Sequence, residues 1–89
     1  MSEIEDYQSL MSDLIKKQMI MLGPNLVLSK ARQVKGLTVG DDGAVLAISG
    51  EAQTALQQLA NEFMNLSGQI AQMTLNTLLA KYPGLKKPS

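Results

Sequence analysis

The chain has 89 residues, of which 45% are apolar; eight Lys and Arg balance eight Asp and Glu, and Cys and His are absent. This length fits a single domain over residues 1–89, and so small a domain often needs disulfides, metals or a second chain to be robustly stable. The composition excludes disulfides and the commonest zinc ligands, and the zero net charge provides no long-range attraction to nucleic acid or anionic lipid.

The first predicted element is a helix over residues 1–22. Apolar side chains recur at intervals of three and four residues from Ile4 through Leu10 and Leu14, which is the spacing of one helical face. Its last turn, MIML, is apolar all round and must be covered by something. Its start is acidic and lacks the positive charge that opens a secretory signal, so a cytoplasmic protein is expected.

Gly23-Pro24 is predicted to end this helix, because proline disfavours helical geometry in the preceding residue and suits the first position of a new helix. A second, shorter helix is predicted over residues 24–34. The densest basic cluster of the chain lies near its C-terminal end and consists of Lys30, Arg32 and Lys35. This cluster is a candidate anion-binding site for a phosphate or an acidic partner. The plainer interpretation is a solvated helix end whose positive charge the helix dipole favours.

A β-hairpin is predicted over residues 36–48, because aliphatic and β-branched runs flank the turn sequence GDDG. An isolated hairpin is marginal in water and needs a packed helix or strands from a second chain. Asp41 and Asp42 could bind a hard cation, but Asp and Gly are also what a tight turn requires. No metal site is therefore assigned to them.

The sequence GLTVGDDGAVLAIS followed by a helix is similar to the first half of roadblock-type dimerisation domains. This resemblance implies a strand pair that precedes a helix in a domain of the dimerising kind. The further strands and helix of that fold have no counterpart in this sequence, so the resemblance assigns no functional residue.

A long helix is predicted over residues 50–82, where Pro83-Gly84 stops it, and a basic tail over residues 83–89. The long helix carries the most specific pattern of the chain, a row of positions spaced alternately by three and four residues over about four heptads. This row, the seam, consists of Ala52, Leu56, Leu59, Phe63, Leu66, Ile70, Met73, Thr77 and Ala80. A second strip consists of Ala55, Ala60, Met64, Ala71, Leu75, Leu78 and Leu79.

Two apolar strips on one helix require two neighbours. The stretch between Glu62 and Lys81 carries no charge, but amides at every turn argue against a membrane span because they would lose their hydrogen bonds to water. Gly68 indicates either close packing of a second backbone or a kink. The seam is either the intramolecular core for the preceding helices or partly a contact with another copy or another protein. The contact with another copy is favoured.

The expected fold class is therefore α+β and mainly helical, in the order α-α-β-β-α, with a central hairpin and a long C-terminal helix, in an intertwined or bundled homo-oligomer. The expected function is a small non-enzymatic, self-associating interaction, adaptor or regulatory module. Its interface is predicted at Leu59, Phe63, Leu66, Ile70 and Met73.

The alternative function is a dimeric nucleic-acid-binding regulatory protein that uses the Lys30, Arg32 and Lys35 cluster. An enzyme is not expected, because the chain is short for a pocket and lacks the usual general base. No cofactor is assigned, and the expected partner is a second copy of the chain.

Overall fold

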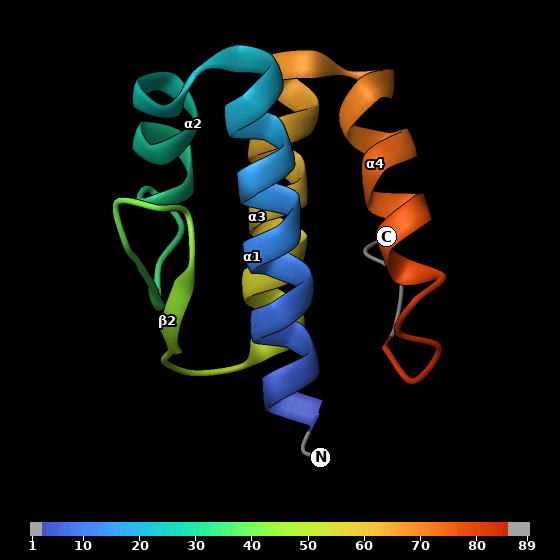
Figure 1. Cartoon of the computed structure of the whole chain (residues 1–89). Coiled ribbons are helices and arrows are strands. Elements are labelled where there is room, and N and C mark those ends of the chain that lie inside the picture. Colours follow the sequence, from blue (N-terminus) through green and yellow to red (C-terminus); the bar gives the residue numbers. More distant parts are fainter. Residues whose placement is uncertain (1–2, 86–89) are drawn as a thin grey trace.

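Figure 1 shows the computed structural model of the chain, which describes residues 3–85. The elements in chain order are α1 (Glu3–Leu22), α2 (Pro24–Ala31), β1 (Leu37–Val39), β2 (Val45–Ile48), α3 (Ala52–Ser67) and α4 (Gln69–Leu79). The strands form one two-stranded sheet, which confirms an α+β, mainly helical fold. Residues 1–2 of the first predicted helix and residues 86–89 of the predicted tail lie outside the described residues.

Helix α1 is the central element of the fold. It packs against α2, α3, α4 and β2, and Figure 1 shows α2 and the hairpin on one side of it and α4 on the other. Its predicted apolar face is buried from Tyr7 through Leu10, Leu14 and Ile15 to Gln18. Ile4, which was predicted on the same face, is 46% exposed. Three- and four-residue spacing thus places a single stripe of α1 against several neighbours at once.

Helix α2 begins at Pro24 as predicted but ends at Ala31, three residues before the predicted end. The backbone tightens there, since the N–H groups of Gln33 and Val34 bond to carbonyls three residues earlier. Tight bonds of this kind commonly close the last turn of a helix. Val34 nevertheless remains in the core, so the inward face of the segment continues past the end of the helix.

The predicted hairpin is present as two antiparallel strands with a register shift between Thr38 and Val39. The Gly40 N–H donates to the Ala44 carbonyl at 2.9 Å across the turn. Helix α1 covers the hairpin, and the backbone N–H of Val45 donates to Ser12 Oγ at 2.8 Å. The hairpin therefore gains the helical support that an isolated strand pair lacks.

The predicted continuous helix over residues 50–82 is wrong. At Gly68 the backbone has φ 57° and ψ −123°, and the chain divides there into α3 and α4, which pack against each other and against α1. Only glycine adopts this combination readily, because a Cβ would clash with the backbone. Within residues 3–85, none of the helices has the length and apolar character that crossing a membrane requires.

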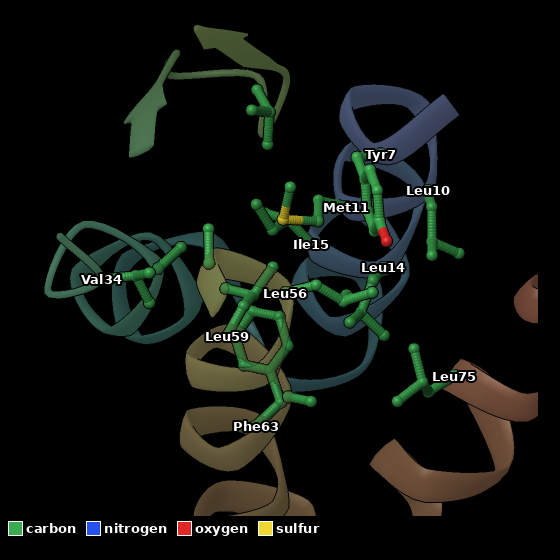
Figure 2. Packing of buried hydrophobic residues seen from close by; sticks show 14 of the residues in the cluster. Tyr7, Leu10, Met11, Leu14, Ile15, Val34, Leu56, Leu59, Phe63 and Leu75 are labelled. Carbon is green, nitrogen blue, oxygen red and sulfur yellow. The ribbon is translucent and has the colours of Figure 1, made fainter. Parts of the chain in front are cut away.

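The core is mainly aliphatic, and its buried aromatic side chains are Tyr7 of α1 and Phe63 of α3. Phe63, Leu56 and Leu59 have no exposed surface. Figure 2 shows these side chains of α3 meeting those of α1, among them Leu14, between the two helices. The first half of the seam is thus the intramolecular core that joins α3 to α1.

Replacing Phe63 with Ala is expected to lower the free energy of unfolding by about 3–5 kcal/mol, because it removes a fully buried ring and leaves a cavity. Urea titration followed by circular dichroism measures the change. The matched control is Met73→Ala on α4, where the side chain is 68% exposed, and there the expected change is within about 0.5 kcal/mol. Equal losses in the two variants would contradict the assignment of Phe63 to the core.

Candidate functional site

The two halves of the seam face opposite environments. Its members in α3, including Leu59 and Phe63, are buried, whereas Ile70 and Met73 in α4 are 53% and 68% exposed. Leu66, near the junction, is partly buried against the core. The predicted interface residues therefore do not share one surface. Leu59 and Phe63 have no surface to offer another chain in this fold, whereas Ile70 and Met73 do.

The second strip takes the inner place on α4. Its members there are all buried and consist of Ala71, Leu75, Leu78 and Leu79. On α3 most members of both rows are buried, because that helix has neighbours on two sides, and Met64 and Leu66 near the junction are partly buried. The turn at Gly68 therefore directs the seam outward on α4, while the second strip faces inward on both helices.

An apolar groove lies between the C-terminal half of α1 and α4, with a volume of about 370 Å³ at one part and 260 Å³ at the adjoining part. Lys17 and Thr74 line both parts and make them continuous. We call it the α1–α4 groove, and its lining consists of Lys17, Ile20, Met21, Ile70, Met73, Thr74 and Thr77. Ile20 is 85% exposed and is the most exposed large apolar side chain among the described residues.

The groove is more apolar than its residue types indicate. The hydroxyl of Thr74 donates to the Ile70 carbonyl at 2.8 Å, and that of Thr77 to the Met73 carbonyl at 3.0 Å. A hydroxyl that bonds back to its own helix has its donor satisfied and needs no external acceptor. Among the lining residues Lys17 alone is charged, so the groove can bury apolar groups and hold one carboxylate or carbonyl oxygen near the ammonium.

Sequence reasoning placed Ile70 and Met73 at an interface but did not name Ile20, Met21 or Thr74. The signal that could have identified Ile20 and Met21 was the MIML turn, which is apolar on every side. In the folded chain Ile20 and Met21 stay largely uncovered, at 85% and 47% exposure. Thr74 carried no signal, because its place in the groove depends on the turn at Gly68.

A buried amide lies next to the α3–α4 junction. Gln18 of α1 has no exposed surface, and its Oε1 accepts a hydrogen bond from Ser67 Oγ at 3.0 Å. Its Nε2 has no hydrogen-bond partner among the described residues. A buried donor without a partner costs about 1–3 kcal/mol. The hydrogen bond between Ser67 and Gln18 therefore fixes the end of α3 to α1, while the unpartnered Nε2 of Gln18 lowers the stability of the fold.

The predicted anion-binding cluster is partly neutralised within the chain. Arg32 Nη2 lies 2.8 Å from Asp41 Oδ1 and also donates to the Val39 carbonyl at 3.3 Å. Lys30 is half-buried and Lys35 is exposed. Arg32 thus joins the end of α2 to the turn of the hairpin, and the carboxylate offsets its charge. This exposed ion pair contributes little to stability, and the geometry adds no support for anion binding.

No group of three or more acidic side chains within residues 3–85 is arranged to hold a metal ion. No family model, no curated protein and no solved structure matches the chain.

Replacing Gln18 with Met is expected to raise the free energy of unfolding by about 1 kcal/mol or more, because a near-isosteric apolar side chain removes the unpartnered donor. Ser67 Oγ keeps an acceptor in the Phe63 carbonyl, at 3.3 Å. Thermal and urea unfolding measure the effect. The matched control is Gln72→Met on α4, where the amide is half-buried and bonds to Asn76 at 3.1 Å, and a change within about 0.5 kcal/mol is expected. A lower free energy of unfolding in the Gln18 variant would contradict the conclusion that Nε2 of Gln18 has no hydrogen-bond partner.

Proposed function

We propose that this chain is a small non-enzymatic interaction module that associates with a second copy of itself through the α1–α4 groove. The observation that carries the proposal is the gathering of exposed apolar side chains around one groove, namely Ile20, Met21, Ile70 and Met73. Contiguous exposed apolar surface on a small protein marks an interaction site more often than scattered single residues do.

The physical driving force is the removal of apolar surface from water, at about 25 cal/mol for each Å². A two-fold symmetric pair buries the groove of both copies in one contact, because the same surface meets itself. Helix α4 carries no charged residue, and the whole chain has zero net charge. The one charged lining residue, Lys17, is exposed, so its ammonium can stay in water at the rim while its aliphatic stem lies against the apolar surface. Met73 and Met21 are flexible and can adapt to an opposing surface.

An adaptor or regulatory role in the cytoplasm is the finer part of the proposal. A chain without cysteine suits a reducing compartment. The lining of the groove offers one ammonium group and threonine hydroxyls that bond to their own helix, which supports binding over catalysis. The alternative of nucleic-acid binding has weaker support, since Asp41 offsets the charge of Arg32.

Light scattering across a dilution series, from millimolar to micromolar protein, tests the proposal. The wild-type mass is expected to approach that of a dimer at the concentrated end, and Ile70→Lys is expected to remain a monomer, because the association would bury an unpaired charge. The stability of the isolated variant is expected to stay within about 0.5 kcal/mol of the wild type.

The matched control for this experiment is Ile4→Lys. Ile4 is 46% exposed on α1 but does not line the groove. This variant is expected to associate as the wild type does. A wild-type chain that is monomeric at every concentration would overturn the proposed function, and dissociation by Ile4→Lys alone would move the interface to another surface.

A further inference from the structure

We propose that two copies of this chain exchange α4 by straightening at Gly68, so that α4 of each copy packs against α1 and α3 of the other. The inference rests on the proposed self-association and specifies its partner, a second copy, and its mode. Exchange of an identical element is a low-cost route to a dimer, because each copy regains the contacts that it gives up.

The first observation is the phase of the seam. The intervals of three and four residues continue without interruption from Phe63 and Leu66 across Gly68 to Ile70 and Met73. We call the folded single chain, with α4 packed on its own α1, the closed chain. In it the regular spacing has no consequence, because the turn leaves Phe63 buried and Ile70 and Met73 exposed. In a straight helix the same residues form one face. The sequence is therefore consistent with a continuous helix as well as with the bent one.

The second observation concerns the backbone at the junction. The N–H of Gly68 bonds to the Met64 carbonyl at 2.9 Å, and the N–H of Gln72 bonds to the Gly68 carbonyl at 3.2 Å. Helix α4 begins between these bonds without a side-chain cap. Straightening gives its first N–H groups the carbonyls at the end of α3 as partners. The hinge thus gains hydrogen bonds when α4 leaves the closed position.

The third observation is that the side of Gly68 where a side chain would lie is open. A Cβ built at Gly68 would have no atom within 4 Å, and the Gln18–Ser67 bond lies on the α3 side of the hinge, so it survives straightening. The inward contacts of α4 come from Ala71, Leu75, Leu78 and Leu79. They would form again on the partner, since its α1 and α3 are identical.

The exchange also accounts for the exposed half of the seam. Ile70 and Met73 lie within the first turns of α4, next to the hinge, where the two copies would come together in a new contact. The α1–α4 groove would then be built by α1 of one copy and α4 of the other, and its exposed apolar residues would lie beside that contact.

A chemical cross-link distinguishes exchange from simple association of closed chains. The chain contains no Cys, so Ser9→Cys and Tyr82→Cys introduce the only thiols. Both positions line one hollow on the N-terminal half of α1, away from the groove lining. With a bifunctional thiol reagent, an exchanged dimer is expected to give a covalent dimer on a denaturing gel. Closed chains that associate by their grooves would link only within each chain.

The hinge itself is tested by Gly68→Ala. Alanine is strained at φ 57° and ψ −123° but favours a straight helix, so the dimer fraction at fixed protein concentration is expected to rise roughly tenfold. The matched control is Gly50→Ala, at φ 83° with no atom within 4 Å of the added Cβ. It carries comparable strain outside the hinge, so its thermal midpoint is expected to fall with no gain of dimer.

The outcomes separate this inference from the proposed function. Cross-links confined within chains in a dimer that Ile70→Lys dissociates would overturn exchange and leave groove association standing. A wild type that is monomeric at every concentration would overturn both the proposed function and the exchange, because the exchange rests on self-association. A monomeric Gly68→Ala variant would overturn exchange. Should that variant fail to fold, inserting Gly-Ser-Gly after Gly68 decides, because a longer hinge favours the closed chain and is expected to reduce the cross-chain dimer.

Discussion

At Gly68 the backbone turns with φ 57° and ψ −123°, and this turn determines which side of α4 faces the rest of the chain. Because of it, Leu75 and Leu78 lie in the core, while Ile70 and Met73 face outward. The same turn lets α4 cover a side of α1 that α2, α3 and β2 leave uncovered. The α1–α4 groove exists only because α4 runs back alongside α1. The fold and the candidate site therefore share one local cause.

Local signals predicted the elements that local chemistry controls. Pro24 marked the start of α2, and the GDDG turn marked the hairpin, because both act through the backbone of a few adjacent residues. The break at Gly68 was different in kind. A glycine inside a helix costs only about 1 kcal/mol relative to alanine, so periodicity across it outweighed its signal. The conformation of Gly68, and with it the side of α4 that faces inward, depends on packing against α1, which no local pattern contains.

The candidate site was predictable in part for the same reason. A row of apolar residues at three- and four-residue spacing identifies a face to be covered but does not say whether the cover is the same chain or another. Phe63 and Ile70 belong to one row, yet Phe63 is buried and Ile70 is exposed. The pairing of Arg32 with Asp41 likewise depends on the hairpin turn lying close to the end of α2. Sequence reasoning had treated these residues as a binding cluster and a turn.

The strength of the attachment differs between the two ends of the junction. Helix α3 is held by the whole first half of the seam, by its second strip, and by the Ser67–Gln18 hydrogen bond. Helix α4 is held by one buried strip, and one member of that strip is an alanine, which buries little surface. Local opening in a protein begins where buried apolar contacts are fewest. Helix α4 is thus held less firmly than α3, and its exposed side, with Ile70 and Met73, is the one that a partner would meet first. In the proposed exchange, the stability of the single chain and the association of two copies would compete for the same short helix, and Gly68 would set the balance between them.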